Sequence, residues 1–190
     1  MWLDRVKKVY GDDLDITWKN FSLEQINSKE GPEWKAWEQG EVTERRSLLG
    51  AMAGEAARRQ GPELYDKFHL ALLTARHGGD GRIALNEEAP LIELAGEVGL
   101  DVGQFTEDLK DQELAKIIGQ DHEEATETHG IFGTPTFVFA NETATYIKTF
   151  IPDEGDSVAA FEHFTALMSS RKYIGEIKRP QPPWPKGAVT

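Results

Sequence analysis

Few residues of this 190-residue chain have side chains suited to catalysis. Cysteine is absent, which excludes disulfides, thiolate nucleophiles and zinc-thiolate sites from these residues. Two of the five histidines, His122 and His129, lie seven residues apart on one predicted helix, which is not the spacing of a zinc-binding H-E-x-x-H motif. We therefore expect surface histidines, no metal site and no catalytic residue.

His77 stands apart because it precedes a glycine-rich turn, Gly78-Gly79-Asp80-Gly81. No Lys or Ser/Thr follows these glycines, so the turn is not a phosphate-binding loop. Capping of the loop is the favoured role for His77. A position facing a ligand groove is the alternative.

A second candidate is the segment Phe132-Gly133-Thr134-Pro135-Thr136-Phe137, which links a predicted long helix to a short apolar run. Proline is tolerated at the start of a strand because its missing N–H is not needed there. Only about 5% of X–Pro bonds are cis, so proline by itself favours an ordinary trans loop. The surrounding elements decide what this loop means.

The predicted elements form a small core of helices and strands that is interrupted by one block of helices. The chain has the length of one domain, and the predicted order is helix, strand, about five helices, strand, strand, helix, which indicates an α/β core with a helical insertion. Gly130 suits the left-handed residue after the longest helix. Helices are predicted over 2–10, 48–56, 62–75, from an Asn86 cap to 98, after Asp101, from an Asp111 cap to 129, and over 157–170. The helix that ends at 129 should face inward with Leu114, Ile117, Ile118 and Ala125. Strands are predicted over 15–21, 136–140 and 145–150.

Charge and hydropathy exclude several kinds of partner. The formal net charge is -12, so the chain would be repelled by nucleic acid. No window reaches about 20 consecutive apolar residues, so we expect no membrane span. The start, Met1-Trp2-Leu3-Asp4-Arg5, lacks the layout of a signal peptide, and we expect a cytoplasmic location.

In this order of elements, the Gly133-Thr134-Pro135-Thr136 loop resembles the DsbA family of thioredoxin-like proteins. That family includes FrnE-like proteins, 2-hydroxychromene-2-carboxylate isomerases and kappa-class glutathione transferases. Trp18–Asn27 looks like the family's second strand and the segment after it. Ile151-Pro152 and Tyr173–Pro180 resemble the actinobacterial branch that contains mycothiol-dependent reductases.

The resemblance implies a thioredoxin-like fold with an all-helical insertion. It assigns 1–27 and 131–172 to the thioredoxin-like core, 44–130 to the insertion and 173–190 to an extended tail of one domain. It implies that Pro135 is cis, and that Gly133, Thr134 and Pro135 bind a peptide or a small thiol or disulfide by strand addition. It implies no bound cofactor, with mycothiol or glutathione as a co-substrate.

The family pattern begins with a strand and a Cys-x-x-Cys turn, or a serine in the isomerase and transferase branches, whereas this chain begins inside the following helix. We expect a truncated start rather than a degenerate one. Without that central strand we expect an incomplete sheet, a repacked sheet, or a homodimer formed through exposed sheet edges.

Three functions remain open from the sequence. The first is a thiol-disulfide oxidoreductase whose full-length form carries the cysteines. The second is an isomerase or transferase of the 2-hydroxychromene type. The third is a non-catalytic thioredoxin-like module that binds through the loop at Pro135.

Overall fold

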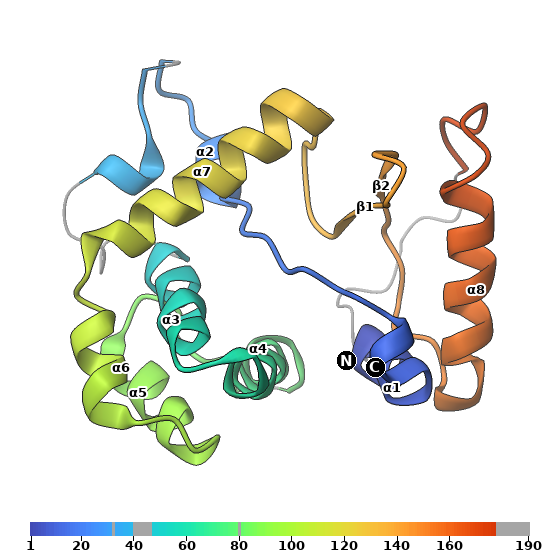
Figure 1. Ribbon diagram of the computed structural model, residues 1–190. Helices are drawn as coiled ribbons and strands as arrows, with labels where there is room; N and C mark the ends of the chain where they lie inside the picture. Colours follow the sequence, from blue (N-terminus) through green and yellow to red (C-terminus); the bar gives the residue numbers. More distant parts are fainter. Residues whose placement is uncertain (32, 40–46, 80, 178–190) are drawn as a thin grey trace. The chain divides into compact units, whose positions relative to one another are not determined.

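The computed structural model describes residues 1–31, 33–39, 47–79 and 81–177 (Figure 1). The chain forms two compact units. One contains Trp18–Thr128, and the other combines Met1–Thr17 with the chain from His129 onward. Residues 18–27, which the resemblance assigns to the thioredoxin-like core, thus lie in the same unit as the helical insertion. We call the two units the helical unit and the terminal unit, and each is described by itself.

The helical unit is built on the apolar stripes that the sequence shows. Its core contains Phe68, Phe105 and Leu91, each fully buried, together with the leucine and alanine side chains of α3. Burial of each large side chain contributes about 1.5–3 kcal/mol, so this core holds the helices together. The helices are α2 (Leu23–Ile26), α3 (Leu48–Arg59), α4 (Pro62–His77), α5 (Glu88–Glu97), α6 (Val102–Asp108) and α7 (Gln112–His129), with a short 3-10 turn at Ala36–Glu38.

Local signals set most ends of these helices. The Asp101 carboxylate accepts from the Gln104 N–H at the start of α6, and the Asp111 carboxylate accepts from the Glu113 N–H at the start of α7. Pro62 is the first residue of α4. Gly130, with φ of 63°, follows α7 in the left-handed region. These caps confirm the corresponding sequence predictions.

The terminal unit pairs a helix from each end of its sequence with a two-stranded sheet. The Trp2 indole Nε1 donates to the Ser157 carbonyl oxygen at 2.8 Å, and its ring meets Phe161 and Phe164 edge to face. Thr136 pairs with Tyr146 in the antiparallel register. The elements are α1 (Trp2–Tyr10), β1 (Thr136–Val138), β2 (Ala144–Tyr146) and α8 (Ser157–Met168), with 3-10 turns at Gly11–Asp13 and Glu154–Asp156.

The strand predicted over 15–21 is wrong, since none forms in this described segment. Its backbone groups pair with side chains of helices: the Asn20 N–H donates to Asp121, and the Trp18 carbonyl oxygen accepts from Arg58. The sheet of the described residues therefore has two strands, which agrees with the expectation of an incomplete sheet. The alternation of apolar and polar residues over 15–21 therefore reflects an extended, half-buried segment that pairs with no other strand.

Smaller differences concern boundaries. The two strands are shorter than predicted, and α5 begins after Glu87 rather than after Asn86. His77 is the last residue of α4 rather than part of the loop. Ile117 is about one-third exposed, so it does not belong to the inner face of α7. Residues 178–190 of the predicted extended tail lie outside the described residues.

Candidate functional site

The loop before β1 contains a cis peptide bond between Thr134 and Pro135. Two hydrogen bonds fix its shape: the Thr136 hydroxyl donates to the Gly133 carbonyl oxygen at 2.7 Å, and the Ile147 N–H donates to the Pro135 carbonyl oxygen at 3.2 Å. Thr134 and Pro135 are both exposed. Within the described part of the chain, neither the N–H nor the C=O of Thr134 has a protein partner. The N–H can therefore donate to a ligand's backbone, and the C=O can accept from it.

Apolar side chains flank this loop. The Phe132 and Tyr146 rings lie 5.1 Å apart, and 66% and 40% of these side chains are exposed. A Cβ at Gly133 would lie 3.5 Å from the Tyr146 ring, which is an ordinary van der Waals contact, so the loop runs beside that ring. Val138 at the end of β1 is also exposed. Clustered exposed apolar side chains of this kind are typical of a binding surface.

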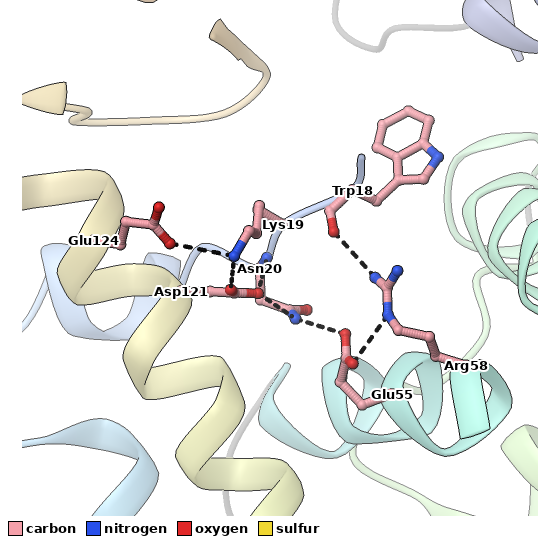
Figure 2. Close-up of polar contacts among 7 residues, drawn as sticks. All are labelled: Trp18, Lys19, Asn20, Glu55, Arg58, Asp121 and Glu124. Carbon is pink, nitrogen blue, oxygen red and sulfur yellow. Dashed lines mark hydrogen bonds and ion pairs between the residues drawn. The ribbon is translucent and has the colours of Figure 1, made fainter. Parts of the chain in front are cut away.

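In the helical unit, a polar network holds the segment that precedes α2 against α7 (Figure 2). The buried Asp121 carboxylate accepts from the Asn20 backbone N–H at 2.9 Å and from the Asn20 side-chain amide at 3.0 Å. Lys19 Nζ lies 2.9 Å from Asp121 and 3.2 Å from Glu124. One buried carboxylate is therefore satisfied by three donors from two adjacent residues.

The same segment is tied to α3 on its other side (Figure 2). The Asn20 amide donates to Glu55 at 2.9 Å, and the Arg58 guanidinium donates to the other Glu55 oxygen and to the Trp18 carbonyl oxygen, both at 3.0 Å. Glu55 is buried, and Arg58 supplies the opposite charge. The network is thus a clamp that positions residues 18–20 between two helices.

The charged groups of this clamp hold the segment in place and supply no general base. The hydrogen bond that Lys19 donates to the Asp121 carboxylate raises the pKa of the Lys19 ammonium, so Lys19 stays protonated at neutral pH and cannot act as a base. The Arg58 guanidinium also lies 3.8 Å over the Tyr65 ring. Burial raises the pKa of the buried Tyr65 hydroxyl, which keeps this phenol neutral.

Tyr65 and Trp18 enclose His69, which the sequence did not single out. The His69 ring lies 4.5 Å from the Trp18 ring and 5.5 Å from the Tyr65 ring. Burial, with a smaller effect from Arg58, lowers the pKa of His69 to about 4. Its buried Nε2 has no hydrogen-bond partner among the described residues. A neutral imidazole with one unused nitrogen is therefore available within the helical unit.

His77 is exposed at the end of α4. Burial lowers its pKa, and the charges of Arg76 and Arg82 lower it further, so the imidazole is neutral at pH 7. It lines a cavity with His69 in the helical unit, whereas the Pro135 loop belongs to the terminal unit.

The prediction that His122 is a surface residue is wrong. His122 is only 4% exposed, and its ring packs between Phe21 and Trp37. Its Nδ1 accepts from the Ser22 N–H at 3.2 Å, and burial lowers its pKa. A signal was present in the sequence, because His122 lies four residues after the inward-facing Ile118 and three before Ala125 on the same helix.

The described residues contain neither a metal-binding cluster nor a membrane-spanning helix. No group of three or more His, Asp or Glu side chains there could hold a metal ion. In the same residues, no helix combines the length and the apolar character needed to cross a bilayer.

Comparison with known proteins agrees with the loop and the helical insertion. The model of the DSBA-like thioredoxin domain matches residues 2–162, which is most of the chain. The chain therefore belongs to the DSBA-like thioredoxin family, and it carries no cysteine. No curated protein matches it.

Proposed function

We propose that this chain is the substrate-binding part of a DsbA-family thiol-disulfide oxidoreductase, a thiol-dependent reductase, and that it docks an extended peptide or a small disulfide at Thr134. The observation that carries the proposal is the cis-proline loop at Gly133-Thr134-Pro135, in which Thr134 is exposed and its backbone N–H and C=O have no partner among the described residues. In strand addition the main-chain hydrogen bonds supply affinity, and neighbouring side-chain pockets supply selectivity. The Phe132 and Tyr146 rings offer an apolar surface for a ligand side chain.

Loss of the Thr134 N–H tests the docking step. Thr134→Pro removes this donor, whereas Thr134→Ala keeps it and removes only the side chain. The probe is the carboxymethylated insulin B chain, an extended peptide without reactive thiols. We expect amide shifts at residues 133, 134 and 136 on titration, a dissociation constant within twofold of the native value for the alanine variant, and at least a tenfold weaker one for the proline variant. Equal binding by both variants would refute docking at this edge.

Catalysis is tested separately with insulin reduction by dithiothreitol. Because these 190 residues carry no thiol, we expect them to leave the rate at the uncatalysed background. The coding sequence before Met1 tests the family function: Cys-x-x-Cys there supports the oxidoreductase, and serine supports an isomerase or transferase of the 2-hydroxychromene type. Turnover by the cysteine-free chain would overturn the assigned division of roles.

A non-catalytic binding module is the second candidate, and the absence of cysteine favours it. It keeps the docking step and needs no redox group. A stop codon directly before Met1 would support this candidate over the oxidoreductase.

The proposal includes a cytoplasmic location, mycothiol or glutathione as the thiol co-substrate, and self-association through the exposed edge of β1. Sedimentation at increasing concentration tests the last point. A strand edge that pairs with a second copy should give a dimer, and Val138→Pro, which removes an N–H directed away from β2, should return the monomer. A monomer at all concentrations would remove self-association from the proposal.

A further inference from the structure

The helical unit contains a cavity of about 180 Å³ that the proposed peptide docking does not use. The segment 18–20, α3 and α4 supply most of its walls. An engineered apolar cavity of about 150 Å³ binds benzene, so this volume suits a ligand with a single ring. Gly54 lies on the wall, and a Cβ added there would meet no atom within 4 Å, which shows that α3 leaves open space.

The cavity walls favour a flat ligand. Trp18, Tyr65 and His69 all line the cavity, and the His69 ring stacks with Tyr65 and lies tilted against Trp18. Leucines from α4 and its following loop supply the remaining apolar surface. The buried Nε2 of His69 has no hydrogen-bond partner among the described residues, so a polar atom of a ligand at that position would satisfy it.

Charge selects the sign of the ligand. Glu55 is the carboxylate on the cavity wall, but Arg58 and Asn20 occupy both of its oxygens, so its charge is compensated. Arg76 also lines the cavity, and among the described residues it uses one N–H donor, on the Ile83 carbonyl oxygen at 3.0 Å. A guanidinium has five such donors in a geometry that fits a carboxylate.

We propose that this cavity is a second binding site, independent of the Pro135 loop, that takes a one-ring organic carboxylate, with the ring against Trp18 and His69 and the carboxylate at Arg76. The inference goes beyond the proposed function because every lining residue lies in the helical unit. The site requires no thiol and no redox step. It binds a ligand and changes no bond.

Benzoate is the probe, measured by isothermal titration with the whole chain and by the proton shifts of the His69 ring. We expect a dissociation constant of about 1 mM or below, the range open to a ligand with this few atoms. Benzamide keeps the shape without the charge and should bind at least tenfold more weakly. Acetate keeps the charge without the ring and should give no saturable binding.

Three variants decide the location. Gly54→Leu fills the cavity and should weaken benzoate binding at least tenfold, whereas Gly54→Ala adds one methyl group and should change it less than threefold. Arg76→Gln should remove the preference for benzoate over benzamide. The urea midpoint of each variant shows whether it folds, and the benzoate-to-benzamide ratio of Arg76→Gln decides the matter if Gly54→Leu does not fold.

Several results would overturn the proposal: no benzoate binding at 10 mM, about ten times the expected dissociation constant; equal binding of benzamide; or unchanged binding in Gly54→Leu. The Thr134→Pro variant separates this site from the proposed function. It should lose the peptide and keep benzoate, so either site can fail without the other.

Discussion

Gly119 lies against the edge of the Trp37 ring inside the helical unit. A Cβ at this position would lie 2.6 Å from Trp37 Cε2, too close for any real contact. The ring packs on the core and cannot withdraw freely. We expect Gly119→Ala to destabilise the unit by about 1–3 kcal/mol through overpacking, measured by urea unfolding.

Gly54→Ala is the matched control, because it is also a glycine within a helix but has open space around its Cβ. Its better helix propensity should stabilise the chain by up to about 1 kcal/mol. If both alanine variants moved the urea midpoint in the same direction, the close packing of Gly119 on Trp37 would be wrong.

His69 makes stability depend on pH. Its pKa is about 4 in the folded chain and 6.5 for free histidine, so the unfolded chain binds the extra proton first as pH falls. The contribution of His69 to the free energy of unfolding is fully present above pH 6.5. It falls as the pH drops below 6.5, until the folded histidine also protonates near pH 4. Each pKa unit is worth about 1.4 kcal/mol, so we expect a loss of about 2 kcal/mol between pH 6.5 and 5 from this residue.

His69→Phe keeps the ring stack and removes the titrating group. Its free energy of unfolding should depend less steeply on pH than that of the native chain over the same interval, because the substitution removes only this ionisable group. At neutral pH this variant should be as stable as the native chain, because the Nε2 of His69 has no hydrogen-bond partner among the described residues. Identical pH profiles would show that His69 titrates normally.

Among the elements, α7 holds segment 18–20 through one buried carboxylate. Asp121→Ala leaves the Asn20 backbone N–H without its acceptor and removes one of the two acceptors of the Asn20 amide, and we expect a loss of about 2–4 kcal/mol in the free energy of urea unfolding. Glu124→Ala removes the exposed partner of the same lysine and should cost less than about 1 kcal/mol. Comparable losses would mean that Asp121 acts only as a surface ion-pair partner.

The contact between α1 and α8 depends on Trp2. Its indole hydrogen bond to Ser157 and its two edge contacts with phenylalanines join helices about 155 residues apart in sequence. Trp2→Ala should destabilise the terminal unit by about 3–5 kcal/mol. Val9→Ala, on the same helix but 68% exposed, should change stability by no more than about 0.5 kcal/mol, and near-ultraviolet circular dichroism with thermal unfolding checks both.

Across the whole molecule, burial is divided unevenly between the two units. The continuous apolar core lies entirely in the helical unit, whereas Val6 is the one buried hydrophobic residue described in the terminal unit. We expect amides of α3 and α7 to exchange with deuterium at least a hundredfold more slowly than those of α1 and β1. Uniform protection across both units would contradict this division.

Net charge is divided in the same way. The helical unit has 12 Lys and Arg against 23 Asp and Glu, so it carries 11 of the 12 net negative charges of the chain. Self-repulsion of this kind weakens the compact state and is screened by salt, which gives the helical unit the stronger dependence on ionic strength.

Sequence by itself determined the helical insertion, the caps of α6 and α7, the glycine after α7 and the proline loop before β1. These features are local: a helical stripe, a capping carboxylate or a G-x-P turn is written within a few neighbouring residues. The absence of cysteine is likewise complete in the sequence. The family resemblance followed from the order of these local features, and the matching family model confirms it.

Only the tertiary structure shows that residues 15–21 form no strand, that His122 is buried and that His69 is neutral. Asn20 meets Asp121 across 101 residues of sequence, so no local pattern could show that its backbone pairs with a carboxylate instead of a strand. A histidine's pKa depends on which rings and charges surround it, and Trp18 and Arg58 reach His69 from other segments of the chain. Local periodicity records which face is buried, whereas polar partners and pKa values depend on distant residues that folding brings together.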